Sequence, residues 1–315
     1  MIKGRVIKST GKWCEVLTSE NEILKCRIRG KIRMEGLRTT NPVAVGDEVK
    51  VKVLKEEHNQ AVVQEIMPRK NYIARKSVNL SKKSQIIAAN VDRAYLVVTL
   101  ALPETHLAFI DRFLVSAEAF RIPVSLVFNK MDVYFEEHLP LIDEIIDIYE
   151  PLGYPCHKIS ALKGENIEVL KQEINHKQIV ISGHSGTGKS TLINALDANL
   201  NIKTGEISTY HLQGQHTTTF AEMHQLASGG FIIDTPGIKA FGVVDLDKTV
   251  ISHYFPEMRE LIGACKYHNC LHINEPNCAV KAAVDKQNIH YSRYKTYLDL
   301  MEEDPEENYR KDIYG

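Results

Sequence analysis

The 315-residue sequence lacks an apolar run of the ~18 residues that a membrane-spanning helix needs. Its first residues alternate between apolar and polar types and contain no continuous apolar h-region, so no secretory signal peptide is predicted. The six cysteines do not form the even framework of a small secreted domain, because three are scattered and three are close together near the end. We find no internal repeat. These absences argue against a membrane or disulfide-stapled secreted protein and favour the reducing cytoplasm.

The length and the charge distribution limit the number of domains and the kind of partner that are expected. A chain of this length is too long for one ordinary core, so two or three domains are expected. The net charge of −1 is uneven, because residues 1–83 carry 19 Lys+Arg against 9 Asp+Glu. The basic excess is concentrated in Lys25–Arg38 and Arg69–Ser84. It indicates a polyanionic partner of the N-terminal part, although a merely solvated basic surface would have the same composition.

The pattern along the chain predicts a multidomain α/β protein. Residues 1–70 contain five short alternating or β-branched runs separated by turn residues, which predicts a small β-barrel of the OB type. The polar, basic residues 71–90 lack strong periodicity and predict a linker. In residues 91–245 apolar strands alternate with helical patterns, which predicts a parallel sheet with helices on both faces and a ligand at the strand ends. Residues 246–315 are predicted to be helical around a Cys/His cluster.

The stretch GHSGTGKS lies between an apolar strand and the start of a helix, and matches the phosphate-loop pattern G-x-x-x-x-G-K-[ST]. Glycines let the backbone wrap closely around phosphates, so that its N–H groups point at them from a helix N-terminus. Lys189 is expected to reach the β- and γ-phosphates, and Ser190 to offer its hydroxyl to Mg²⁺. The predicted phosphate-binding residues are Gly183, His184, Ser185, Gly186, Thr187, Gly188, Lys189, Ser190 and Thr191.

Two further segments suit the γ-phosphate side of such a site. DTPG follows an apolar strand, where Asp234 suits a metal-holding role and Gly237 can direct its N–H to a γ-phosphate. Between the phosphate loop and DTPG lies GQHTTTF, residues 214–220. Either Thr217 or Thr218 could complete the Mg²⁺ coordination there, and a Thr-rich edge strand is the alternative interpretation.

NKMD and SAL fit the pattern that reads guanine. Asp132 would accept two hydrogen bonds from the guanine N1–H and 2-amino group, a pair that adenine does not offer. Asn129 would hold the loop and contact N7 or O6, and the stem of Lys130 would stack on the base. A βα turn with an Asp N-cap is the alternative for NKMD. The predicted base-binding residues are Asn129, Lys130, Met131, Asp132, Ser160, Ala161 and Leu162.

The order of these motifs is unusual. GTPases generally carry the phosphate loop first and NKxD and SA last, whereas here NKMD and SAL come first. Joining the old ends of a domain and cutting it elsewhere preserves such a site, because domain termini tend to lie close together. A permuted GTPase between a small β-barrel and a Cys/His cluster resembles the RsgA (YjeQ) family along nearly the whole chain. The resemblance implies a GTPase that binds the small (30S) ribosomal subunit and its rRNA late in maturation and is released on hydrolysis.

The Cys/His cluster reads CKYHNCLHINEPNC. Cys265, Cys270, His272 and Cys278 match the zinc pattern of that family, which implies one structural zinc ion held by three thiolates and an imidazole. His268 is a fifth candidate, for which an exposed turn residue is the favoured interpretation, and free thiols are the alternative for the whole cluster. The zinc would stabilise a segment that is too poor in apolar residues to fold by itself.

The residue that follows DTPG bears on catalysis. Ile238 occupies the position where Ras-type GTPases carry a water-orienting Gln, so we expect weak intrinsic hydrolysis that a partner accelerates. His216 is a candidate to position the water, and a plain loop residue is the alternative. Two other functions stay open: a non-catalytic RNA-binding module in which GTP is structural, and a permuted GTPase of the large subunit. Asp132 disfavours an ATPase, and nothing in the sequence indicates an obligate oligomer, so a monomer is expected.

Overall fold

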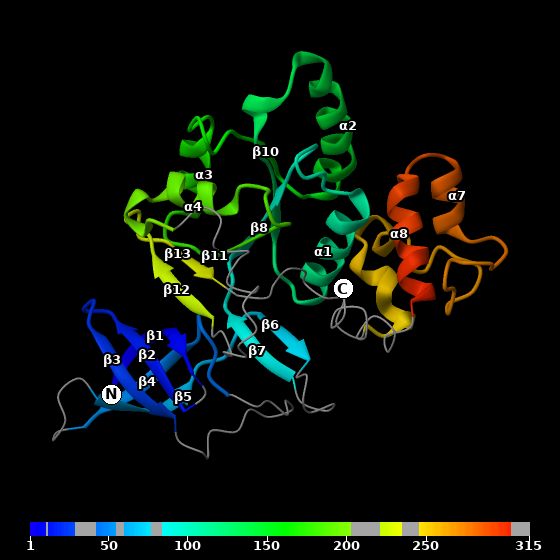
Figure 1. The fold of residues 1–315 in the computed structure, drawn as a ribbon. Helices are drawn as coiled ribbons and strands as arrows, with labels where there is room; N and C mark the ends of the chain where they lie inside the picture. The colour runs from blue at the N-terminus through cyan, green and yellow to red at the C-terminus, as the bar shows by residue number, and fades with distance from the viewer. Residues whose placement is uncertain are drawn as a thin grey trace, which may run out of the picture.

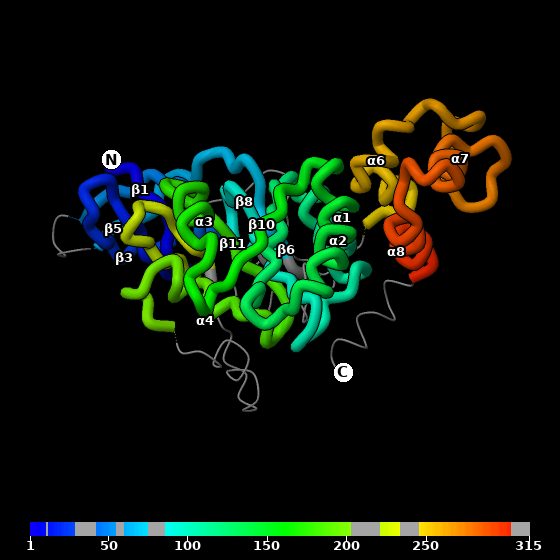
Figure 2. The backbone as a smooth tube through the Cα atoms, turned by 90° about the horizontal axis from the view of Figure 1, so that it is seen from above, coloured from blue at the N-terminus to red at the C-terminus, as the bar shows by residue number. Residues whose placement is uncertain are grey.

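The computed structural model describes residues 1–10, 12–28, 42–54, 60–76, 84–202, 221–234 and 246–303. A small β-barrel, a sheet covered by helices and a C-terminal group of helices follow one another along the chain (Figure 1). Seen from above, the barrel and the C-terminal helices lie at opposite ends of the molecule with the sheet between them (Figure 2). No helix within the described ranges is long and apolar enough to cross a membrane.

The five strands predicted for the N-terminal part all form, and they close into a barrel. Strand β1 pairs with both β2 and β4, β3 pairs with β5 in parallel, and β4 pairs with β5, so the ring has no open edge. Alternate residues point inward, as the period of two requires, and Val6, Val16 and Val51 are fully buried. The strands are β1 (Ile2–Ser9), β2 (Trp13–Thr18), β3 (Ile23–Ile28), β4 (Glu48–Val53) and β5 (Gln60–Ile66).

The segment expected to be a linker is partly regular, which corrects that expectation. Strands β6 (Tyr72–Lys76) and β7 (Ser84–Ala89) pair as an antiparallel two-stranded sheet. Ile73 and Ala88 are buried in the core on one face of the central sheet, and Ile86 is buried in a separate small cluster with Ala44 and Ala89. In the sequence, the many charged residues conceal this short apolar alternation. Burial of the three apolar side chains stabilises the strands by more than the charged neighbours disfavour them.

The central sheet has the predicted parallel strands, with one addition. Its order is β10-β9-β8-β11-β13-β12, in which the first five strands are parallel and β12 is antiparallel to β13. The edge strand β12 was not predicted, because it has only four residues, EMHQ, and three of these are polar or charged. The strands are β8 (Arg93–Val98), β9 (Val124–Phe128), β10 (Cys156–Lys158), β11 (Gln178–Ser182), β12 (Glu222–Gln225) and β13 (Phe231–Asp234).

Helices cover both faces of this sheet, as predicted. Successive residues of β8 serve opposite faces: Leu96 and Val98 pack with α1 and α2, whereas Tyr95 and Val97 pack with α3 and α4. The strand is therefore buried on both sides, which explains its continuous apolar run. The helices are α1 (Leu107–Ala119), α2 (Leu139–Tyr149), α3 (Ile167–Ile174) and α4 (Lys189–Leu196).

The barrel and the sheet are joined edge to edge. β1 pairs with β12 through Lys8 and Glu222, whose side chains also form an ion pair of 3.1 Å, so the two parts share one eleven-stranded sheet (Figure 1). The guanidinium of Arg5 lies 4.8 Å from the ring centre of Phe231 at the same junction. The barrel thus covers an edge strand that would otherwise expose unpaired backbone groups.

The C-terminal part has an apolar core of its own, contrary to the expectation that it is too poor in apolar residues to fold. Phe255, Met258, Tyr297 and Leu300 are buried together, and Val115 of α1 joins them from the central part. The aromatic side chains supply apolar area that the many polar neighbours in the sequence obscure. The elements are a 3₁₀ helix at Lys248–Tyr254, α6 (Pro256–Arg259), α7 (Ala279–Asp285) and α8 (Tyr291–Glu302).

A buried charged cluster attaches α8 to the central part. Arg293 of α8 donates to Asp111 of α1 at 2.8 Å and to the two carboxylate oxygens of Glu257 at 2.8 and 3.2 Å. Thr296 and Tyr149 also donate to Asp111, each at 2.8 Å. Burial alone would lower the pKa of Arg293, but the two carboxylates outweigh it and raise that pKa.

Candidate nucleotide site and metal centre

The glycine-rich loop passes from β11 into α4 with little space around its backbone. Gly183 and Gly188 have φ values of +144° and +93°, which other residues rarely adopt. A Cβ atom at Gly183 would lie 2.4 Å from the carbonyl oxygen of Val97, and one at Gly188 would lie 2.3 Å from Nδ2 of Asn129. The two positions therefore require glycine, and the loop forms the close-fitting cradle that phosphate binding needs.

The side chains of this loop close it on itself. The Nζ atom of Lys189 donates to the carbonyl oxygen of Gly183 at 2.8 Å and also to that of His184. The hydroxyl of Thr187 donates to the same carbonyl of His184 at 3.0 Å. Ser190 is half-buried in the first turn of α4, directly after the cradle. An ammonium and a hydroxyl thus lie beside the backbone N–H groups at a helix N-terminus, the arrangement predicted from the sequence.

Asn129 joins the phosphate loop to the guanine motifs. Its Nδ2 donates to the carbonyl oxygen of Thr187 at 2.8 Å, and its Oδ1 accepts from the backbone N–H of Ala161 at 3.0 Å. Asn129 is 2% exposed, and its backbone N–H donates to the carbonyl oxygen of Val98 at 3.0 Å. One amide therefore ties NKMD, SAL and GHSGTGKS together. The predicted convergence of these three motifs is confirmed, whereas their binding of a nucleotide stays a prediction.

Asp132 and Ser160 form the other contact between the guanine motifs. The hydroxyl of Ser160 donates to Oδ1 of Asp132 at 2.5 Å and accepts from the N–H of Lys163 at 3.1 Å. The N–H of Met131 donates to the carbonyl of Ile159 at 3.1 Å. The carboxylate of Asp132 is thus held in one orientation, and its Oδ2 carries no hydrogen bond among the described residues. Leu162 beside it is 73% exposed.

Lys130 has an unusual backbone conformation, and its side chain contacts a neighbouring loop. Its backbone is in the left-handed region at φ +66°, and its Nζ donates to the carbonyl oxygen of Leu102. The loop that follows β8 also approaches Gly186, because a Cβ there would lie 3.3 Å from Cδ of Pro103. Sequence reasoning missed this loop, which borders both the base-reading and the phosphate-binding motifs and carries no motif of its own.

His184 rests on α1. Its ring centre lies 3.7 Å from that of Phe109, and burial, followed by the charge of nearby Lys189, lowers the pKa of this imidazole. The neutral form is therefore favoured next to the ammonium, which leaves a single positive charge at the loop. Phe109 was not anticipated as part of the site, since it reads in the sequence as one more apolar residue of a helix.

Several predicted residues lie outside the described residues. His216, Thr217, Thr218 and Gly237 are among them, and of Asp234 only the backbone is described, at the end of β13. The strand end does place Asp234 next to β11, the strand that leads into the phosphate loop. The roles predicted for these residues stay predictions.

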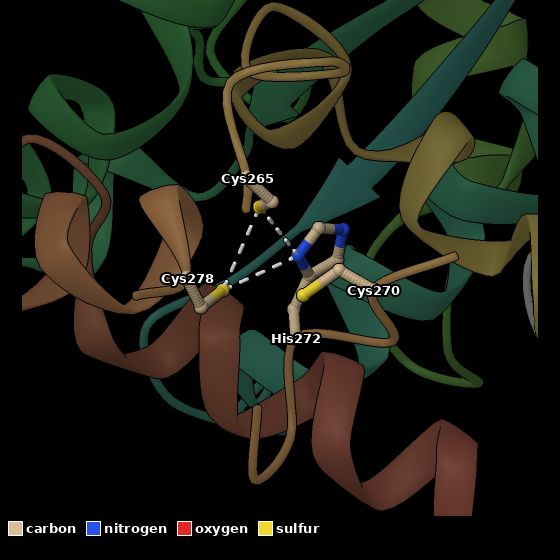
Figure 3. Close-up of side chains that lie close together, drawn as sticks. All are labelled: Cys265, Cys270, His272 and Cys278. Atoms are coloured by element: carbon tan, nitrogen blue, oxygen red, sulfur yellow. Dashed lines mark hydrogen bonds between the residues drawn. The ribbon is translucent and has the colours of Figure 1, made fainter. Parts of the chain in front are cut away.

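The structure brings the four predicted metal ligands together. The donor atoms of Cys265, Cys270, His272 and Cys278 all lie within 4.8 Å of one another (Figure 3). The Sγ atoms of Cys265 and Cys278 are 3.9 Å apart, and Nδ1 of His272 lies 3.6 and 3.4 Å from them. A tetrahedral zinc ion would place sulfurs about 3.8 Å apart and a sulfur and a nitrogen about 3.5 Å apart. The three separations among Cys265, His272 and Cys278 fit this geometry, and the Sγ atom of Cys270 lies within 4.8 Å of each of these donor atoms.

The surroundings hold this cluster in place. Glu275 accepts from the N–H groups of Leu271, Ile273 and Asn274 at 2.8, 2.9 and 3.1 Å, which shapes the turn around His272. Tyr294 donates to the carbonyl of His272 at 2.7 Å. Burial lowers the pKa of His272, so the imidazole is neutral, the form that binds metal.

His268 is exposed and lies outside the cluster, in agreement with the favoured interpretation of that residue as an exposed turn residue.

Comparison with known proteins separates the barrel from the nucleotide-binding part that follows it. Residues 66–244 match the family described as RsgA GTPase, and residues 3–63 match the RsgA N-terminal domain. "Small ribosomal subunit biogenesis GTPase RsgA 2" of Bacteroides thetaiotaomicron is 52% identical over 309 residues, which covers 98% of this chain and 99% of that protein. The RsgA protein of Christiangramia forsetii is 51% identical over 314 residues, 99% of each chain.

Two solved structures resemble this one. YjeQ from Thermotoga maritima has a TM-score of 0.77 at 34% identity, covering 95% of this chain and 97% of its own. YloQ, described as a circularly permuted GTPase, has a TM-score of 0.72 at 27% identity, covering 96% and 94%. The match extends over the barrel, the permuted sheet and the C-terminal helices together.

Proposed function

This chain belongs to the RsgA family of GTPases, and we propose that it hydrolyses GTP to GDP and phosphate on the small ribosomal subunit during late maturation of that subunit. Its rRNA is the proposed polyanionic partner of the basic N-terminal part, and the cytoplasm is the proposed compartment. Hydrolysis is proposed to release the protein from the subunit.

The observation that carries this proposal is the side chain of Asn129. It bonds the phosphate loop at Thr187 and the guanine motif at Ala161, two segments whose order in the sequence the permutation reverses. A buried amide with both ends satisfied holds its partners in a fixed relation. A nucleotide whose phosphates lie at the glycine cradle would therefore place its base at Asp132 and Leu162.

Different residues are proposed to bind the phosphates, to bind Mg²⁺ and to affect the rate of hydrolysis. The N–H groups of the loop and the ammonium of Lys189 would hold the β- and γ-phosphates. Ser190 is proposed to hold Mg²⁺, which when bound neutralises charge on the phosphate oxygens. The chain supplies Ile238 where a water-orienting Gln is usual, so the intrinsic rate is proposed to be slow and a group from the subunit to complete the site.

The test of the proposed function is GTP turnover with purified subunits. Small subunits are expected to accelerate phosphate release by at least about 10-fold over the protein alone, because a partner completes the catalytic site. Large subunits at the same concentration serve as the control. Equal acceleration by large subunits would redirect the proposal to that particle, and no acceleration by either would favour a non-catalytic, GTP-dependent RNA-binding module.

Asp132→Asn is expected to weaken GTP binding on the order of 10²-fold and to shift preference toward xanthine nucleotides. An asparagine Oδ1 can still accept from Ser160, so the loop keeps its shape while the second carboxylate oxygen, which would pair with guanine, is lost. Competition of GTP and XTP against a fluorescent GDP analogue measures this. Asp143→Asn, an exposed carboxylate on α2, is the control. An unchanged order of preference would refute the base-reading role of Asp132.

The Cys/His cluster is proposed to hold one structural zinc ion. The donor set of three sulfurs and one nitrogen is typical of closed zinc sites, and the separations among Cys265, His272 and Cys278 fit that ion. Metal analysis of purified protein is expected to give one zinc per chain, and Cys278→Ser to reduce it. Cys156→Ser, a cysteine outside the cluster, should keep the full content. Equal metal in the two variants would count against the assignment.

A further inference from the structure

One face of the barrel carries an exposed aromatic side chain paired with a cation. Trp13, at the start of β2, lies directly opposite Arg27 of β3. The guanidinium carbon of Arg27 is 4.9 Å from the centre of the indole, and 39% of Trp13 is exposed although it is the only tryptophan in the chain. Strand β3 lies at the end of the molecule away from the C-terminal helices (Figure 1, Figure 2).

The backbone fixes the direction of both side chains. The neighbouring Cys14 and Cys26 are buried in the barrel core, so Trp13 and Arg27 must point outward from the same two strands. Thr10 donates to the carbonyl of Trp13 through its N–H at 2.8 Å and through its hydroxyl at 3.1 Å. The backbone of Trp13 is therefore fixed by hydrogen bonds, and both residues of the pair lie on strands of the barrel.

The surroundings are suited to a negatively charged ligand. Lys12 and Lys25 are exposed next to the pair, and Glu15 lies on the same face, directly opposite Lys25. Residues 1–83 carry an excess of ten positive charges, 19 Lys+Arg against 9 Asp+Glu. A cross-strand pair of this kind stabilises a sheet by about 0.2–1 kcal/mol whether or not a ligand binds. Stabilisation of the sheet does not require a large indole to remain exposed beside lysines. Recognition of a base requires such an exposed indole.

We propose that Trp13 and Arg27 form a stacking platform for an unpaired nucleobase of single-stranded RNA, with Lys12 and Lys25 near its phosphates. The proposal rests on the proposed function, because it identifies where the barrel contacts RNA. The second and third strands of an OB barrel offer the surface on which such folds take oligonucleotides. Unpaired bases are the target, because aromatic and guanidinium planes stack on bases that are splayed out of a helix.

The experiment uses the full-length protein and its single tryptophan as the reporter. Titration with a 12-nucleotide mixed-sequence RNA is expected to quench the indole emission, and the same sequence as a duplex is expected to leave it unchanged. Anisotropy of a labelled oligonucleotide should show affinity reduced about 5- to 100-fold by Trp13→Ala, the range for loss of one stacked base. Trp13→Phe should restore most of it, since a phenyl ring also stacks.

Phe135→Ala is the matched control, because Phe135 is another exposed aromatic residue, 71% accessible, but lies beside Glu136 and Glu137. It is expected to leave RNA affinity unchanged. Binding of a fluorescent GDP analogue by each variant confirms that it is folded. Equal RNA affinity of Trp13→Ala and wild type, or equal quenching by the duplex, would overturn the platform. Neither result depends on GTP turnover, so failure of the platform is distinguishable from failure of subunit-stimulated hydrolysis.

Discussion

Gly188→Ala is expected to reduce the affinity for GTP and GDP by at least about 100-fold, through overpacking and loss of a buried hydrogen bond. The new Cβ would lie 2.3 Å from Nδ2 of Asn129, far inside contact distance, and the residue would be forced to keep φ near +93°. Asn129 cannot retreat without breaking its bonds to Thr187 and Ala161. The substitution therefore acts on the phosphate loop and on both guanine motifs at once.

Gly153→Ala separates this effect from backbone strain. Gly153 has a similar φ of +88°, but nothing lies within 4 Å of the position its Cβ would take, and it follows α2 away from the loop. An alanine there costs about 1–2 kcal/mol of stability through the left-handed backbone and should leave nucleotide affinity unchanged. Binding of a fluorescent GDP analogue measures both variants. Comparable affinity in the two would show that the contact between Gly188 and Asn129 does not shape the site.

The sequence predicts those parts of the site that are formed by short runs of consecutive residues. The cradle at Gly183 and Gly188 is recognisable because close backbone approach demands glycine at fixed spacing. NKMD and SAL are recognisable because each follows a strand of the parallel sheet, and parallel strands end at the same edge of a sheet. Their convergence on Asn129 required only that the order of the motifs be understood as a permutation.

The contacts that depend on packing between distant elements could not be predicted in this way. Phe109 beneath His184 has no signature beyond helical periodicity, and the pairing of β12 with β1 depends on how two domains meet. The strand β12 is short and polar, so local propensity gives no reason to expect it. Such features are set by tertiary context, which a single sequence does not display.

Buried charged residues are the contacts between distant elements that are hardest to predict from a single sequence. Arg293, Asp111 and Glu257 read as ordinary surface residues, since charged side chains are almost never fully buried unless they are paired. Their positions are separated by 182 residues between Asp111 and Arg293 and by 36 between Glu257 and Arg293. Only the fold shows that they meet, and the energetic consequence is large because none of them can regain water.

Arg293→Met is expected to lower the stability of the C-terminal helices by about 3–5 kcal/mol, because it leaves the carboxylates of Asp111 and Glu257 buried without their cation. The side chain of Arg293 is 1% exposed and those of Asp111 and Glu257 are 0% and 6% exposed. Arg293→Lys should recover only part of the loss, since one ammonium cannot reproduce the fork that reaches both carboxylates. Urea unfolding followed by far-ultraviolet circular dichroism, with site-resolved hydrogen exchange, measures the change.

Arg259→Met is the matched control for this prediction. Arg259 of α6 pairs with Glu118 of α1 at 2.9 Å, but its side chain is 50% exposed, so its loss is expected to cost about 0–1 kcal/mol. Because Asp111 lies on α1, faster exchange in Arg293→Met should extend from α8 into α1, the helix on which His184 of the phosphate loop rests. Equal destabilisation by the two variants would contradict the role of burial. Faster exchange confined to α8 would show that Arg293 holds its own helix and does not join it to the nucleotide-binding part.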